Sequence, residues 1–204
     1  MVDAGHQDFE SLHAHVKKLV RDTLDPNFET IEKHAEIPEN IVDQFRRLGL
    51  FGMSIPKKYG GLGLTTVEEM SILEALTYTN ACFRSRVGTN NSIGSMGIVF
   101  DGTDEQRKTY LPRIASGEWT TSFALTEPNA GSDASGIVTT AELDGDYWVL
   151  NGNKIFITNA DTASLFTTIA VTDEKKRAHG GVTAFLVERE MGRASCRERV
   201  YGEV

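Results

Sequence analysis

The spacing of apolar residues changes once along this chain of 204 residues, and that change constrains the fold more than any other feature. Up to about residue 118 the apolar residues recur at helical spacing. Beyond Gly117, short runs of β-branched and aromatic residues are separated by turn pairs such as Asp144-Gly145 and Asn151-Gly152. The pattern predicts an α+β chain, with a helical bundle followed by an antiparallel β-sandwich or barrel.

Local signals mark where the helices begin and end. Pro38 stands where a proline is tolerated in a first helical turn, and the apolar face that follows it ends at Gly49. Two pairs have the spacing of a capping box: Thr65 with Glu68, and Thr103 with Gln106. We expect Pro112 to interrupt the last helical segment.

Strands are expected in the second part of the chain, at residues 121–125, 139–143, 147–150, 154–158, 166–171 and 182–187. Helices do not alternate with these strands, which argues against a Rossmann domain. The predicted domains are residues 1–118 and residues 119–190, the second being incomplete. The tail, residues 191–204, lacks strand alternation and is not expected to join the sheet. It is either a surface extension or the product of a reading frame lost near Glu190.

Composition excludes several classes of function. Hydrophobic residues make up 40% of the chain and charged residues 25%, as in soluble globular proteins. A net charge of −8 argues against a nucleic-acid partner. The first ten residues resemble neither a signal nor a transit peptide, and no apolar run reaches the ~18 residues of a membrane span. We therefore expect a cytoplasmic protein that does not enter a membrane.

Cysteine and histidine usage points to neither a disulfide framework nor a metal. The two cysteines, Cys82 and Cys196, form no CxxC pair and suit a reducing compartment. His13 and His15 are two residues apart, so on a helix they point in different directions and cannot share a metal ion. No metal site is expected.

Residues 123–133, FALTEPNAGSD, form the first stretch with chemical content. A predicted strand runs here into a loop that contains a proline, a glycine and small polar residues. Such a loop can present unpaired backbone N–H groups to an anion, with Gly131 allowing close approach and Ser132 adding a hydroxyl donor. The pattern alone is compatible with a phosphate-binding loop or with a tight surface turn.

Residues 151–159, NGNKIFITN, form the second stretch. In a strand, Phe156 and Thr158 would lie on the same face and place an aromatic ring beside a hydroxyl. That pair could bind a planar heterocycle by stacking and one hydrogen bond. The alternative is a core Phe beside a surface Thr.

Taken together and in this order, the two stretches resemble the flavin-binding signature of the acyl-CoA dehydrogenases. The resemblance extends backward through RLGLFGMSIPKKYGGLGL and GTDEQRKTYLPRIASGEWTTSFALTEPNAGSD and ends at Glu190. It implies a helical domain followed by a β domain, truncated before the family's carboxy-terminal helical bundle. The cofactor would be FAD.

The resemblance also implies the cofactor-binding residues: Phe123, Leu125, Thr126, Gly131, Ser132, Phe156, Ile157 and Thr158. Thr126 would donate a hydrogen bond to the isoalloxazine ring. Gly131 and Ser132 would meet the pyrophosphate, and Ser132 would also face the acyl-CoA substrate. Relatives often carry Trp where this chain has Phe156, a change that keeps an aromatic face.

The implied reaction is α,β-dehydrogenation of an acyl-CoA thioester, with an electron-transfer flavoprotein as electron acceptor and a homo-oligomer as the complete enzyme. The family's catalytic base is a glutamate in the carboxy-terminal bundle. None of the glutamates here occupies that position, and Glu127 is expected to be structural. The fragment is therefore expected to be inactive. The competing interpretations are an acyl-CoA oxidase or flavin monooxygenase of the same fold, and a non-catalytic module that binds flavin or CoA.

Overall fold

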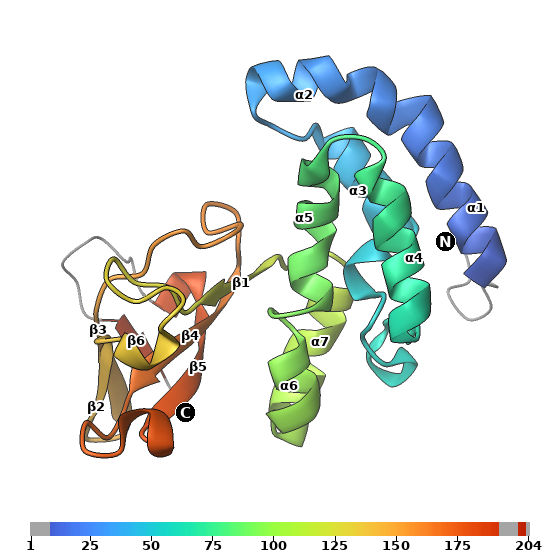
Figure 1. The fold of residues 1–204 in the computed structure, drawn as a ribbon. Coiled ribbons are helices and arrows are strands. Elements are labelled where there is room, and N and C mark those ends of the chain that lie inside the picture. Colours follow the sequence, from blue (N-terminus) through green and yellow to red (C-terminus); the bar gives the residue numbers. More distant parts are fainter. Residues whose placement is uncertain (1–8, 192–199, 203–204) are drawn as a thin grey trace. The chain divides into compact units, whose positions relative to one another are not determined.

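A computed structural model describes residues 9–191 and 200–202 of the chain. The chain divides between Glu118 and Trp119 into two compact units, which are described separately below. Helices make up the first unit and a sheet makes up the second (Figure 1). This order confirms the predicted α+β class.

The first unit contains α-helices joined by short 3-10 and π turns. The α-helices are α1 (Phe9–Leu19), α2 (Phe28–His34), α3 (Glu39–Arg47), α4 (Thr66–Thr77), α5 (Ala81–Asn91), α6 (Met96–Asp101) and α7 (Asp104–Ala115). The shorter turns are η1 (Val20–Leu24), η2 (Asp25–Asn27), η3 (Leu50–Gly52) and η4 (Lys57–Tyr59). No helix in the described ranges is both long and apolar enough to cross a membrane.

Both predicted capping boxes are present. The hydroxyls of Thr65 and Thr103 accept hydrogen bonds from the N–H groups of Glu68 and Gln106, whose side chains bind back to the capping residues. Helices α4 and α7 begin at these positions. The expectation for Pro112 was wrong: α7 continues through it to Ala115. Pro112 lies inside α7, in its third turn, and the helix does not end there.

The core of the helical unit is formed by α1, α3, α4 and α5. Leu12 and Val16, which are one turn apart on α1, are fully buried. The rings of Phe45 and Phe83 meet edge to face with their centroids 6.1 Å apart. This core stabilises the unit by removing apolar surface from water.

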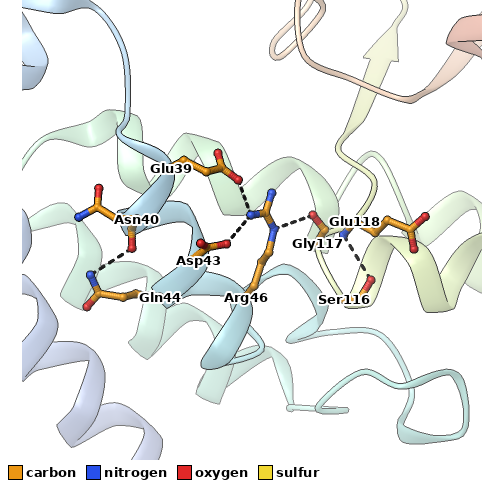
Figure 2. Close-up of polar contacts among 8 residues, drawn as sticks. All are labelled: Glu39, Asn40, Asp43, Gln44, Arg46, Ser116, Gly117 and Glu118. Carbon is orange, nitrogen blue, oxygen red and sulfur yellow. Dashed lines mark hydrogen bonds and ion pairs between the residues drawn. The ribbon is translucent and has the colours of Figure 1, made fainter. Parts of the chain in front are cut away.

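Arg46 holds the segment through which the chain leaves the helical unit (Figure 2). Its Nε donates to the carbonyl of Gly117 at 3.1 Å, and its Nη1 lies 2.5 Å from Glu39 and 2.7 Å from Asp43. Gly117 has a φ of 72°, and a Cβ at this position would lie 2.4 Å from a ring carbon of Phe51. Only glycine fits this position without strain.

The second unit contains a six-stranded sheet. Its strands are β1 (Thr121–Ala124), β2 (Thr140–Asp144), β3 (Tyr147–Asn151), β4 (Leu165–Val171), β5 (Val182–Glu188) and β6 (Val200–Gly202). The 3-10 turns of this unit are η5 (Ala134–Gly136), η6 (Arg177–His179) and η7 (Arg189–Met191). The strand order is β1-β4-β2-β3-β6, and β5 pairs with β4.

The sheet is mixed. Strands β2 and β3, β3 and β6, and β4 and β5 pair antiparallel, as expected. The expectation of a purely antiparallel sheet was wrong for β1 with β4 and for β2 with β4, which pair parallel. Because β5 covers one edge of β4 from end to end, β1 and β2 share the other edge. Between β1 and β4 the chain passes through β2 and β3, so this parallel pairing joins segments that no single turn connects.

Residues 154–158 are not a strand, contrary to the prediction. Phe156 and Asn159 have φ values of 56° and 61°, in the left-handed region. That backbone cannot continue a pleated ladder. The Asn151-Gly152 pair is not a hairpin turn either, since Asn151 is the last residue of β3. The other hairpin does form, with Gly145 at a φ of 63° between β2 and β3.

Part of the tail does join the sheet. Val200–Gly202 pairs with β3, so the expectation that the tail stays outside the sheet was wrong for these residues. The exposed edge of a strand offers N–H and C=O groups to any segment that reaches it, whatever the alternation of its side chains. The rest of the tail from residue 192, with the expectations placed on it, lies outside the described residues.

Candidate cofactor-binding site

The structure brings the two stretches singled out in the sequence together. The hydroxyl of Ser122, a fully buried residue in β1, donates to the carbonyl of Thr158 at 2.7 Å. The N–H of Ile155 donates to the carbonyl of Thr126 at 2.9 Å. Residues 123–126 and 155–158 therefore form one local structure, although they are far apart in sequence.

A buried ion pair joins the same stretches. Lys154 Nζ lies 2.7 Å from Glu127 Oε1 and 3.0 Å from the carbonyl oxygen of Leu125. The Glu127 carboxylate also accepts the N–H groups of Val138 at 2.7 Å and Thr139 at 3.0 Å. The pair thus fixes both ends of the loop between β1 and β2.

These contacts determine the charge state of Glu127. Burial raises its pKa, but hydrogen bonds from Lys154, Thr139 and Val138 outweigh burial and hold the pKa at about 2. The carboxylate is ionised at neutral pH, and its oxygens are engaged by these donors. A general base must be free to take a proton near the operating pH, and these contacts do not favour that for Glu127.

The loop after β1 turns tightly and then becomes exposed. Glu127 and Ala130 exchange backbone hydrogen bonds of 2.9 and 3.1 Å, and Gly131 and Ser132 follow on the surface. Among the described residues, the backbone N–H groups of Gly131 and Ser132 have no hydrogen-bond partner. No atom comes within 4 Å of the position that a Cβ would take on Gly131. This arrangement leaves room and donors for an anionic group.

The second stretch presents an aromatic ring and a hydroxyl. Phe156 is 89% exposed, which is unusual for a large apolar side chain, and Thr158 is also exposed. Ile157 between them is half-buried. The alternating exposure that the sequence suggested is therefore kept, even though the backbone is not a strand. Within the described residues, the hydroxyls of Thr126 and Thr158 have no partner and remain available as donors.

The side chains of Phe123 and Leu125 are less exposed than those of Phe156 and Thr158. Both are half-buried, and Leu125 packs against a small core formed by Ala130, Ile137 and Val171. Phe123 lies in β1 opposite Thr167 of β4. Part of each side chain thus belongs to the β unit's own packing.

Sequence reasoning did not identify Ser122 and Lys154, which hold the two stretches together. Ser122 lies inside a predicted strand, and nothing in the sequence around a small polar residue there indicates a hydrogen bond to a distant segment. Lys154 was taken as the first residue of a strand. Its partner Glu127 was expected to be structural, and the geometry agrees with that expectation.

The sequence matches two family models. The acyl-CoA dehydrogenase N-terminal domain matches residues 6–118, and the acyl-CoA dehydrogenase middle domain matches residues 122–202. The chain belongs to the acyl-CoA dehydrogenase family, which confirms the resemblance seen in its motifs.

Three relatives illustrate how similar the chain is to known proteins. Over 184 residues the chain is 38% identical to 3-(aryl)acrylate reductase of Clostridium sporogenes, covering 88% of this chain and 48% of the relative. It is 35% identical over 178 residues to an acyl-CoA dehydrogenase of Bacillus subtilis, covering 85% and 47%. A solved acyl-CoA dehydrogenase of Bacillus anthracis, complexed with FAD, is similar with a TM-score of 0.80 at 32% identity, covering 94% and 32%. The chain spans about half the length of these curated relatives.

Proposed function

We propose that this chain supplies the flavin site of an FAD-dependent acyl-CoA dehydrogenase acting in fatty acid metabolism. The reaction is oxidation of the Cα–Cβ bond of an acyl-CoA thioester. The proposal rests chiefly on the convergence of the two stretches through the bonds from Ser122 to Thr158 and from Ile155 to Thr126. Family membership and the FAD complex of a relative support it.

The domains follow the same proposal. Residues 1–118 are the amino-terminal helical domain, residues 119–190 are an incomplete middle β domain, and residues 191–204 are an atypical tail. The division of the chain after Glu118 is consistent with the first boundary.

The residues present fit a flavin. The proposed contacts are Phe123, Leu125, Thr126, Gly131, Ser132, Phe156, Ile157 and Thr158. When bound, FAD supplies the acceptor for the hydride that leaves the β carbon. The exposed ring of Phe156 offers a face for a planar heterocycle, and the hydroxyls of Thr126 and Thr158 offer hydrogen bonds. The unpaired N–H groups of Gly131 and Ser132 suit the pyrophosphate.

Substrate binding is assigned to Ser132 among these residues. Its side chain is exposed at the loop after β1, where a hydroxyl can serve the cofactor and an acyl-CoA ester in turn. In the complete enzyme the partners are the acyl-CoA substrate, an electron-transfer flavoprotein and further copies of the same chain.

The catalytic base lies outside these 204 residues in our proposal. The α proton of a thioester is weakly acidic and requires a positioned base. Glu127 does not qualify, because its pKa is about 2 and its oxygens bind Lys154 and two backbone N–H groups. The family's base is a glutamate of the carboxy-terminal bundle. We therefore expect the chain by itself to bind FAD without turning over acyl-CoA.

A second candidate is reduction of the double bond of an α,β-unsaturated acid or thioester, the reverse of the proposed reaction. It is favoured by the similarity to 3-(aryl)acrylate reductase. An acyl-CoA oxidase, a flavin monooxygenase and a non-catalytic binding module are less favoured candidates. On the complete enzyme, peroxide as product identifies an oxidase, and reduction of an electron-transfer flavoprotein identifies a dehydrogenase.

The proposal is tested by anaerobic titration of the purified chain with FAD, followed by acyl-CoA esters of several lengths, while flavin absorbance is recorded. We expect a bound-flavin spectrum and no bleaching. Failure to bind FAD would contradict the flavin site. Bleaching that is lost in Glu127→Gln but kept in Glu142→Gln, an exposed control in the same unit, would show that the base was misplaced.

A further inference from the structure

The turn that follows the second stretch is anchored by Arg189, a residue distant in sequence that follows the last residue of β5. Residues 159–163 form a tight turn in which Ala163 N–H donates to the carbonyl of Asn159 at 2.7 Å. Arg189, just after β5, donates from Nε to the carbonyl of Ala163 and from Nη2 to that of Ala160, each at 2.6 Å. One side chain therefore binds two carbonyls of the turn.

Two further contacts fix the position of Arg189 itself. Its backbone N–H donates to the carbonyl of Ser164 at 2.9 Å. Its guanidinium lies over the ring of Phe166 in β4, 5.6 Å from the centroid. The planar guanidinium presents several N–H donors in a fixed geometry, so it can reach two carbonyls at once from this position. An ammonium group is a point donor and cannot reproduce both bonds.

The segment before the turn has an unusual backbone that requires fixed surroundings. Phe156 is left-handed, a conformation that bulky residues rarely adopt, and Asn159, a residue type that tolerates this conformation, is left-handed too. Such residues persist where the neighbouring structure holds them in place. On one side Ser122 binds the Thr158 carbonyl, and on the other side the turn held by Arg189 begins at Asn159.

We propose that Arg189 is a positioning residue for residues 156–158: by holding the turn it sets the direction of the Phe156 ring and of the Thr158 hydroxyl. The proposal that this orientation serves FAD rests on the proposed function. The side-chain hydrogen bonds of Arg189 go to the turn, so it acts on the segment through the turn. Its removal should loosen the segment while the paired strands of the sheet stay intact.

The first measurement is hydrogen exchange of a peptide spanning residues 156–164, without FAD. Arg189→Met should speed exchange there by about tenfold or more, because both anchoring bonds are lost. Arg189→Lys should lie between Arg189→Met and the wild type. Lys176→Met removes the same charge from the same unit at an exposed position and should leave this peptide unchanged. Peptides from β2 and β3 report whether each variant is folded.

The second measurement is the dissociation constant for FAD, together with the spectrum of the bound flavin. We expect the order of affinity to be wild type and Lys176→Met, then Arg189→Lys, then Arg189→Met, with a total span of about tenfold. Should Arg189→Met fail to fold, Arg189→Lys carries both measurements.

Each outcome decides a separate point. Unchanged exchange in the Arg189 variants overturns the positioning role. Faster exchange with unchanged FAD affinity and spectrum overturns its link to the flavin. A wild-type chain that binds no FAD overturns the proposed function, while the exchange data still decide whether Arg189 holds residues 156–158.

Discussion

Lys154 Nζ lies 2.7 Å from Glu127 Oε1, and the two side chains are 11% and 3% exposed. This ion pair ties residue 154 to the loop that follows β1. Burying two charges costs desolvation, so the pair adds little stability relative to an apolar pair. Removing one partner is costly, because it leaves the other charge buried and unpaired.

Replacing the lysine should therefore destabilise the β unit strongly. We expect Lys154→Met to lower the free energy of unfolding by about 3 kcal/mol. The double variant Lys154→Met/Glu127→Gln should recover part of the loss, because no buried charge remains. Urea unfolding followed by tryptophan fluorescence measures this directly, since Trp119 and Trp148, the only tryptophans of the chain, both lie in this unit. An equal loss in the exposed control Lys175→Met would contradict the account.

The same pair predicts how stability depends on pH. The pKa of Glu127 is lowered from 4.5 to about 2 in the folded chain. Its contribution is therefore fully present above pH 4.5 and is lost as the pH falls towards 2. The loss amounts to about 3 kcal/mol. Urea midpoints at pH 6 and pH 3 should fall further apart in the wild type than in Glu127→Gln, and equal shifts in the two proteins would refute the assignment.

Gly117 should tolerate no side chain. Gly117→Ala forces a left-handed alanine and a contact of 2.4 Å with the ring of Phe51, so we expect a loss of about 2–4 kcal/mol in the helical unit. Gly60→Ala is the matched control, because Gly60 is also left-handed but has no atom within 4 Å of its Cβ position. That control should cost about 1 kcal/mol. Helical circular dichroism during unfolding compares them, and similar losses would rule out the steric contact.

Features encoded locally could be predicted from the sequence. The capping pairs Thr65–Glu68 and Thr103–Gln106 fixed the starts of α4 and α7, because a cap involves residues three positions apart. The parallel pairing of β1 with β4 could not be predicted, since it joins Thr121 to Leu165, which are far apart in sequence and not linked by a single turn.

The candidate site shows the same division. The residue types in the two stretches pointed to the site, and the exposure of Phe156 and Thr158, with half-buried Ile157 between them, follows the pattern in the sequence. The backbone conformation of residues 156–158 could not be predicted from the sequence, because the hydrogen bond from Ser122 to the Thr158 carbonyl spans 36 residues. Alternation of apolar and polar side chains predicts a strand, but a left-handed Phe156 keeps the alternation and ends the ladder.

Two substitutions probe the hydroxyls of the proposed site. In the complete enzyme, Ser132→Ala and Thr158→Val should each weaken binding of FAD or of the acyl-CoA ester by about 1–3 kcal/mol, the range for a lost partner of a buried polar group. Isothermal titration measures both affinities. Thr183→Val, an exposed position in β5, is the control and should change neither. If neither substitution changes either affinity, these residues do not belong to the site.

The most direct test of the central claim, that the two stretches form one flavin site, is hydrogen exchange of the chain with and without saturating FAD. Bound ligand slows exchange where it contacts or rigidifies the backbone. The account predicts slower exchange in two separate peptides, one covering residues 123–132 and the other residues 156–158, with the β2–β3 hairpin turn at Gly145 unaffected. Protection of only one of these peptides, or of neither while FAD is bound, would contradict it.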